Sequence, residues 1–289
     1  SGTRVLAMLL DAIGMLQGPT NAALDHIWFG LLLKRPRWYR RSSRAERSRV
    51  MSLFSKLAAG SYGLAPTELR VIFSATIERL TFSYNHKADV AENSDVFLRL
   101  VRHYLAGRDR PARGDGRWAF KEPNSYIFLE ELTEQFPRMR YIHTVRNGLD
   151  MAFSSNQNQV LNWGDQFGID VSELDALRPE QSIEFWVRAN EHAIDRGRAL
   201  LGDRFTTICF EELCEQSHAT IEGLFDFLGL PLSAERLDEL AAIPTLPGSH
   251  GRHHDEDLTA VPDRLLDHAR ELMASLRTSD QSRVGNVSP

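Results

Sequence analysis

The hydrophobic pattern along the chain predicts helices that alternate with short strands. Near the start, apolar residues recur at helical spacing over residues 5–13, and the pattern ends at Gly14. Near the middle, residues 139–145 are rich in β-formers, residues 146–148 break the run, and helical spacing then returns. This order predicts a strand, a turn and a helix, which is typical of an α/β fold.

The same reasoning predicts the remaining elements. We expect helices over residues 22–33, 129–136, 182–201 (ending at Gly202) and around 221–228, short strands over 118–121 and 205–210, and loops over 107–116 and 157–179. Residues 51–105 have helical spacing, with Val71, Ile72, Ala75, Ile77 and Leu80 on the expected core face. We interpret residues 1–278 as one domain with a helical insert at 34–106, followed by a polar tail at 279–289.

Arg146 and Ser154 suggest an anion site beside the middle strand. Ligands of α/β sheets lie beyond the carboxyl ends of the strands, where the N-terminus of a helix offers free N–H groups. Arg146 would stand there, and Ser154 would lie one to two turns into the following helix. The alternative is an Arg that covers the edge of the sheet and a Ser that faces solvent.

The first residues also suggest phosphate binding. Ser1-Gly2-Thr3-Arg4 is a small turn that leads into a helix, as in phosphate loops. The Walker pattern is absent because Gly2 is followed by Thr3 and not by Lys. A simple helix cap is the alternative.

Taken together, the chain resembles the sulfotransferases that use 3′-phosphoadenosine-5′-phosphosulfate (PAPS). The family's phosphosulfate loop ends in Ser-Gly-Thr-Thr-x-Leu, which is similar to residues 1–6 with Arg4 in place of one Thr. Its 3′-phosphate element is an Arg at a strand end with a Ser eight residues later, matched by Arg146 and Ser154. Further motifs agree in order: Lys121-Glu-Pro, Trp186-Val-Arg-Ala-Asn, Phe210-Glu-Glu-Leu, Phe227-Leu-Gly-Leu-Pro and Gly251-Arg252. The match covers residues 1 to about 276 and is most similar to the bacterial and tyrosylprotein-sulfotransferase-like branch.

This resemblance implies a fold and a set of site residues. The fold would be a P-loop-type three-layer α/β/α arrangement with a parallel central sheet, whose first strand is missing from the given N-terminus. PAPS would be the donor and PAP the product, with no metal required. The resemblance assigns donor binding to Ser1, Gly2, Thr3, Arg4, Arg146, Ser154 and Arg252.

For catalysis, the resemblance assigns stabilisation of the departing phosphate to Lys121, with a paired structural lysine as the alternative. The acceptor's base would be Asp25 or His26, with a purely structural role of both as the alternative, because residues 18–21 depart from the branch's Gly-Glu-Glu-Thr pattern. An Asp25 base would give an acidic pH limb and a His26 base one near neutrality. We expect Asp150 to order the turn after Arg146, and Trp163 and Phe167 to contact the acceptor.

Composition limits the function further. The net charge of −5 disfavours nucleic-acid binding. The eight basic residues within 34–49 form either a solvated face or a mouth for an anionic substrate. The two cysteines lack the spacing of a zinc or redox site, no membrane span is visible, and we expect a cytoplasmic protein, although a signal or anchor before Ser1 is compatible with the sequence.

Three functions are compatible with these features. The first is a sulfotransferase acting on a hydroxyl or amine of a small molecule or peptide. The second is a P-loop kinase, and the third is a nucleotide-binding protein without activity. A metal site at His250, His253, His254 and Asp255 is a further alternative that sulfuryl transfer does not need.

Overall fold

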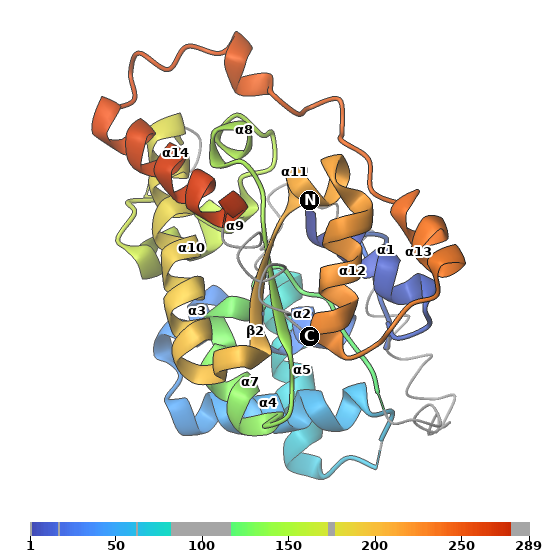
Figure 1. Ribbon diagram of the computed structural model, residues 1–289. Helices are drawn as coiled ribbons and strands as arrows, with labels where there is room; N and C mark the ends of the chain where they lie inside the picture. Colours follow the sequence, from blue (N-terminus) through green and yellow to red (C-terminus); the bar gives the residue numbers. More distant parts are fainter. Residues whose placement is uncertain (1, 17, 62, 82–116, 173–176, 279–289) are drawn as a thin grey trace. The chain divides into compact units, whose positions relative to one another are not determined.

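The computed structural model describes residues 2–16, 18–61, 63–81, 117–172 and 177–278 (Figure 1). Helices predominate in these ranges, together with one parallel sheet of two strands. The α/β class predicted from the sequence is therefore confirmed. The chain forms two compact units: residues 1–5 with 139–289 make up the first unit, and residues 6–138 the second. Helix α1 (Gly2–Ala12) starts in the first unit and ends in the second.

The sheet of the first unit consists of β1 (Tyr141–Val145) and β2 (Phe205–Cys209). The strands run parallel, with Tyr141 opposite Phe205 and Val145 opposite Cys209. Both carboxyl ends therefore meet at one edge of the sheet, and the next residues along the chain are Arg146 and Phe210. This edge is the place where α/β proteins bind ligands.

Helices cover this sheet. They are α8 (Gly148–Ala152), α9 (Asn158–Trp163), α10 (Pro179–Leu201), α11 (Phe210–Glu215), α12 (Ser217–Leu228), α13 (Ala234–Ala241) and α14 (Asp263–Thr278), with 3-10 turns η2 (Gly164–Phe167), η4 (Gly202–Arg204) and η5 (Arg252–Asp255). Helix α10 packs on both strands and on α14. In Figure 1, α10 and α14 lie on one side of the strands and α12 on the other.

The sequence predicted the buried face of α10 correctly. Its core residues are Ile183, Trp186, Val187, Ala193 and Ile194, all of them buried. Gly202 ends the helix with a φ of 57°, a left-handed value that glycine adopts without strain. The helical spacing of a long segment therefore located both its core face and its end.

The second unit is helical and has an aromatic core. Its elements are α2 (Ile27–Leu32), α3 (Pro36–Arg41), α4 (Arg44–Ala58), α5 (Pro66–Thr81), η1 (Ser125–Phe128) and α7 (Leu129–Gln135). Phe29, Phe54 and Phe120 lie within contact distance of one another around α2. On α5 the predicted core face is only partly right, because Ala75 is buried but Ile77 is 47% exposed. The rest of the predicted insert, residues 82–106, and the predicted loop at 107–116 lie outside the described residues.

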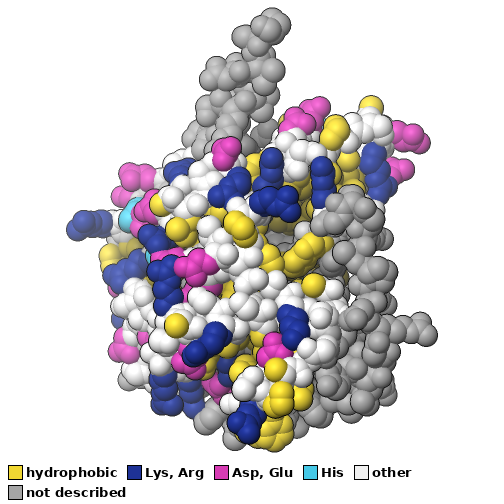
Figure 2. All heavy atoms as spheres, turned by 90° about the horizontal axis from the view of Figure 1, so that it is seen from below, with side chains coloured by type: hydrophobic (Ala, Val, Ile, Leu, Met, Phe, Trp, Pro, Cys, Tyr) yellow, Lys and Arg dark blue, Asp and Glu magenta, His cyan; other side chains and the backbone are white. Residues whose placement is uncertain are grey.

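Acidic residues neutralise much of the basic segment 34–49. The ion pairs are Arg35–Glu78, Arg44–Glu134, Arg47–Glu131 and, at 3.7 Å, Lys34–Glu122. Arg35 is buried, with only 4% of its surface exposed. In Figure 2, Lys and Arg side chains lie among those of Asp and Glu on the face that is shown. These pairs favour a structural role for this segment over an open mouth for anions.

Two predicted elements differ from the structure in the second unit. The helix expected over 22–33 is confined to α2, because Asn21 accepts hydrogen bonds from the backbone N–H groups of Ala23 and Asp25 and holds a turn. Leu24 adopts a left-handed φ of 62° in that turn. The strand expected over 118–121 is reduced to one bridge between Ala119 and Leu16.

In the first unit, the segment 157–179 was predicted as a loop. It contains α9 and η2, and Trp163 at the end of α9 is fully buried. Phe167 packs edge-on against Phe185 of α10. Both aromatic side chains therefore belong to the packing of the unit, and the prediction that they contact the acceptor is wrong for Trp163 in this structure.

Candidate functional site

The turn between β1 and α8 presents Arg146 at the edge of the sheet. The side chain of Asn147 caps α8 by accepting hydrogen bonds from the N–H groups of Leu149 and Asp150. The N–H of Asn147 donates to the buried carboxylate of Glu211 at 2.9 Å. Asn147, and not Asp150 as predicted, therefore orders this turn.

Trp186 holds the backbone of the same turn. Its indole Nε1 donates to the carbonyl of Arg146 at 2.9 Å. A Cβ on Gly148 would lie 2.3 Å from the indole, so only glycine allows this approach. The prediction that Trp186 is a core residue is confirmed, and its contact fixes the position of the Arg146 backbone.

The guanidinium of Arg146 has a buried N–H that no group in the described part of the chain accepts. Its Nη2 donates to Ser249 Oγ at 3.1 Å, and the group lies 5.5 Å from the centre of the Phe210 ring. Its Nε is buried and has no hydrogen-bond partner within the described part of the chain. A half-buried cation with a buried, unused N–H is suited to an anion, because an unpaired donor is costly in a low dielectric.

The segment 249–253 brings Arg252 and Ser154 to the same neighbourhood. Arg252 Nε donates to the carbonyl of Ser249, and its Nη1 donates to the carbonyl of Phe153, both at 3.2 Å. The hydrogen bonds of Ser249 link Arg252 to Arg146, and Arg252 also bonds the residue that precedes Ser154, so the three residues predicted for the 3′-phosphate lie in one neighbourhood.

Ser154 nevertheless does not lie within a helix as predicted. Helix α8 ends at Ala152, and the side chain of Gln157 donates to the carbonyls of Met151, Ala152 and Ser154. These bonds satisfy the C-terminal carbonyls of the helix and end it after five residues. The hydroxyl of Ser154 accepts from the N–H of Asn156 at 3.2 Å, which leaves its own O–H to donate.

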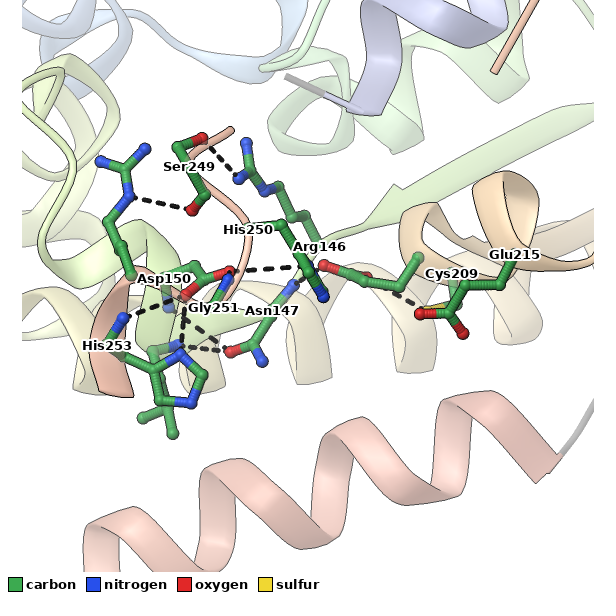
Figure 3. Close-up of polar contacts among 12 residues, drawn as sticks. Arg146, Asn147, Asp150, Cys209, Glu215, Ser249, His250, Gly251 and His253 are labelled. Carbon is green, nitrogen blue, oxygen red and sulfur yellow. Dashed lines mark hydrogen bonds and ion pairs between the residues drawn. The ribbon is translucent and has the colours of Figure 1, made fainter. Parts of the chain in front are cut away.

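Asp150 anchors this segment to α8 (Figure 3). Its carboxylate accepts hydrogen bonds from Gly251 N at 2.8 Å, from His253 N at 3.3 Å and from His253 Nδ1 at 2.7 Å. Burial alone would raise the pKa of the Asp150 carboxyl, but these bonds outweigh it and hold the pKa below its ordinary value. Asp150 therefore carries a negative charge at neutral pH.

The N-terminus of α1 lies against the same edge of the sheet. A Cβ on Gly2 would meet Phe210 at 2.9 Å and Thr144 of β1 at 3.0 Å, so a larger residue would force the helix end away. Phe210 thus contacts both Gly2 and Arg146. Thr3 is half-buried and Arg4 is exposed, while Ser1 lies outside the described residues. The start of a helix beside Arg146 adds free N–H groups to an anion site.

In the second unit, two predicted catalytic residues form one ion pair. Lys121 Nζ donates to Asp25 Oδ1 and, at 3.0 Å, to the carbonyl of Ala23. Lys121 is buried, and the side chain of Asp25 is 19% exposed. Asn21 donates to the other oxygen of Asp25 at 3.3 Å. The predicted alternative of a paired lysine is thus what this structure contains, with Asp25 as the partner.

His26 lies in an apolar environment beside this pair. Its side chain is 1% exposed, and its ring packs against Phe54 and Phe120. Neither ring nitrogen has a hydrogen-bond partner within the described residues, and a Cβ on Gly18 would lie 2.1 Å from Nε2. Burial lowers the pKa of His26 to about 4, so the ring is neutral at pH 7. An enclosed imidazole is less suited than Asp25 to meet an acceptor.

Sequence reasoning missed Ser249. Its hydroxyl contacts Arg146 across 103 residues of chain. The signal was its position in the Gly-Ser-His-Gly-Arg run that contains Arg252.

The histidines next to Arg252 do not form a metal cluster. Within the described residues, no group of three or more His, Cys, Asp or Glu side chains is arranged to hold a metal ion. His253 instead bonds Asp150. Among the described helices, none has the length and apolar character needed to cross a membrane.

Comparisons with known proteins identify the family of the chain. Neither the curated proteins nor the solved structures gave a match. A family model described as "Sulfotransferase family" matches residues 1–234, which include α1, the β1–α8 turn and the Lys121 pair. Because this match covers most of the chain, the protein belongs to the sulfotransferase family.

Proposed function

We propose that this protein moves the sulfuryl group of PAPS to a hydroxyl or amine of a small molecule or peptide, and releases PAP. One observation supports the donor above all: beside Arg252 and the N-terminus of α1, Arg146 has a buried Nε that no group among the described residues accepts. A phosphate would take up the unused N–H and the remaining donors of these groups.

The residues present fit the two ends of this donor. Arg146, Arg252 and the hydroxyl of Ser154 would hold its 3′-phosphate, because Ser249 links the two arginines, Arg252 bonds the residue before Ser154, and the three groups offer cationic and neutral donors. Gly2 and Thr3, with Ser1 and Arg4, would hold the phosphosulfate side. The buried Gly2 lets a phosphate approach the helix backbone, where a side chain would interfere.

The catalytic part of the proposal concerns Lys121, Asp25 and His26. PAPS, when bound, supplies an activated sulfuryl group. Lys121 has three N–H donors, and within the described part of the chain two of them are bonded to Asp25 and Ala23, so one would offset developing negative charge. Asp25 is the partly exposed carboxylate beside it, and we assign it the removal of the acceptor's proton. His26 is the second candidate for that role.

A P-loop kinase and a non-catalytic nucleotide-binding protein are the other readings of the site. A P-loop kinase would carry a Gly-Lys pair at the start of α1, and this chain has Gly2-Thr3 there. The non-catalytic reading would leave the Lys121 pair without a kinetic role. The proposal also includes the cytoplasm as the compartment, in keeping with the free thiols of Cys209 and Cys214.

Calorimetry without divalent metal tests the donor. We expect the protein to bind PAP and to bind ATP much more weakly, because Arg146 and Arg252 are assigned to the 3′-phosphate, which ATP lacks. Adding Mg²⁺ should leave PAP binding unchanged. Tight, Mg²⁺-dependent binding of ATP with no response to PAP would overturn the proposal in favour of a kinase.

A further inference from the structure

We propose that Asp150 is a positioning residue for the donor site: its buried carboxylate fixes the segment 249–253 so that Ser249 and Arg252 lie beside Arg146. This inference rests on the proposed function, since it assigns the fixed segment to donor binding. Asp150 would touch neither PAPS nor the acceptor, and it would act through the backbone that it holds.

The contacts of the Asp150 carboxylate lead to this segment. The side chain is fully buried, and its three N–H donors come from Gly251 and His253. His250 Nδ1 lies a further 3.9 Å from Oδ2. Figure 3 shows these groups pointing at Asp150 from a stretch of chain about 100 residues away. Arg252 Nη1 also bonds the carbonyl of Phe153 at the end of α8, so the carboxylate and this bond together link the two stretches.

The backbone of the segment is shaped for this carboxylate. Gly251 has a φ of 75°, a left-handed value that strains other residues. This conformation lets the N–H groups of Gly251 and His253 point at one side chain, while the Ser249 hydroxyl contacts Arg146 and the Arg252 guanidinium bonds the carbonyls of Ser249 and Phe153. Gly251 and His253 bond Asp150, and Ser249 and Arg252 are their neighbours in the chain. One buried carboxylate can therefore orient the side chains of Ser249 and Arg252.

The effect of removing the charge of Asp150 on PAP affinity separates a positioning role from a purely electrostatic one. A carboxylate near a phosphate site repels the phosphate, so removing the charge of Asp150 without other consequences would strengthen PAP binding. Positioning predicts the opposite sign. The amide of Asn has one acceptor oxygen and an NH₂ group, so Asp150→Asn would set a donor against an N–H of Gly251 or His253 and release the segment.

The experiment compares Asp150→Asn with Asp255→Asn, which removes the same charge from an exposed position in the same loop. PAP affinity is measured by calorimetry, and amide hydrogen exchange is measured over residues 249–255. We expect Asp150→Asn to bind PAP about ten- to a hundredfold more weakly, as hydrogen bonds to a buried charge are lost. Exchange at Gly251 and His253 should become faster, and Asp255→Asn should match the wild type in both measurements.

The outcomes separate this inference from the proposed function. A folded Asp150→Asn protein that binds PAP as tightly as the wild type, or more tightly, would overturn the inference. If the wild type itself does not bind PAP, the proposed function fails, and hydrogen exchange alone then tests the inference. Unchanged exchange at Gly251 and His253 in Asp150→Asn would overturn the positioning role. Faster exchange confined to residues 249–255 would support the positioning role.

A second variant applies if Asp150→Asn does not fold. His253→Ala removes one of the three hydrogen bonds and keeps the buried charge. We expect a smaller loss of PAP affinity, about two- to tenfold, with faster exchange at Gly251. Wild-type affinity and exchange in this variant would count against the inference.

Discussion

The two units of the molecule differ in how the charged side chains of their candidate sites are paired. In the first unit, Asp150 and the carbonyls of Ser249 and Phe153 hold the segment around Arg252, while Arg146 keeps a buried N–H without a partner. In the second unit, Lys121 and Asp25 neutralise each other. We call these groups the Arg146 cluster (Arg146, Asp150, Ser249, Gly251, Arg252 and His253) and the Lys121 pair (Lys121 and Asp25).

This difference separates binding from chemistry. A cluster whose cations are oriented by backbone groups and one buried acid has donors left over for an anion, which suits tight binding of a phosphate. An ion pair that is already neutral gains little from binding an anion. Its carboxylate can instead accept a proton, and its ammonium can stabilise negative charge that develops in the transition state. Substitutions in the two groups should therefore affect different measured quantities.

The largest effect is expected from Arg146→Ala. Removing the guanidinium should weaken PAP binding by about 2 to 5 kcal/mol, because a desolvated phosphate loses a charged partner. Calorimetry of PAP binding measures this loss. Arg140→Ala is the matched control, since Arg140 precedes the same strand and packs over Phe227. Equal PAP affinity in the wild type and folded Arg146→Ala would make Arg146 a residue that only covers the sheet edge.

The sequence predicted elements best where one local signal dominated. Long helical spacing located α10 and its core face, and Gly202 marked its end. The β-rich run before Arg146 located β1 to within two residues. In these stretches apolar periodicity and the breaking residue agree, so tertiary contacts had nothing to override.

Local side-chain bonds explain the failures. The amide of Asn21 holds a turn that cuts short the helix predicted from residue 22, although the apolar spacing continues through it. In the same way, Gln157 ends α8 before Ser154. Such bonds depend on the direction of one side chain, which periodicity does not encode.

Long-range pairing was equally hidden in the sequence. The ion pair of Lys121 with Asp25 joins residues 96 positions apart, and the bond of Asp150 to Gly251 joins residues 101 apart. The resemblance to a family named Arg146, Ser154 and Arg252 individually. Their connection through Ser249 and Phe153 required the fold.

The next largest effect is a loss of stability at acid pH that arises from His26. Burial lowers the pKa of His26 from 6.5 to about 4, so the unfolded chain binds the proton first as the pH falls. Its contribution is fully present above pH 6.5, is lost between pH 6.5 and about 4, and amounts to about 3 kcal/mol. Burial also lowers the pKa of His143 in the first unit to about 4, so His143 likewise reduces the stability of the protein as the pH falls.

His26→Leu separates the two histidines. Leucine does not ionise and leaves no nitrogen unpaired among Phe54 and Phe120. Urea unfolding from pH 7.5 to 4 should therefore show a shallower loss of stability in His26→Leu than in the wild type. His143→Leu instead removes the partner of Asn190, so it should lower stability already at neutral pH. Parallel pH curves for His26→Leu and the wild type would show that His26 is not buried as a neutral ring.

The third prediction concerns turnover and the Lys121 pair. Lys121→Ala should lower kcat by about a hundredfold, while PAP affinity changes little, because the charge is needed mainly in the transition state. Lys56→Ala is the matched control, since Lys56 forms an ion pair with Glu68 in the same unit. Loss of PAP binding in folded Lys121→Ala, with kcat retained, would place Lys121 among the binding residues and break the separation between the two groups.

Asp25→Asn and His26→Leu then identify the base. The sequence alone suggested that a pH limb near neutrality would mark His26, but burial lowers the pKa of His26 to about 4, so the substitutions must decide. We expect Asp25→Asn to lower kcat by about a hundredfold, because an amide cannot take up the acceptor's proton. His26→Leu should keep the wild-type rate, since its enclosed ring meets no acceptor. The reverse pattern would move the base to His26, and wild-type rates in both variants would exclude both residues while leaving the Arg146 cluster as the donor site.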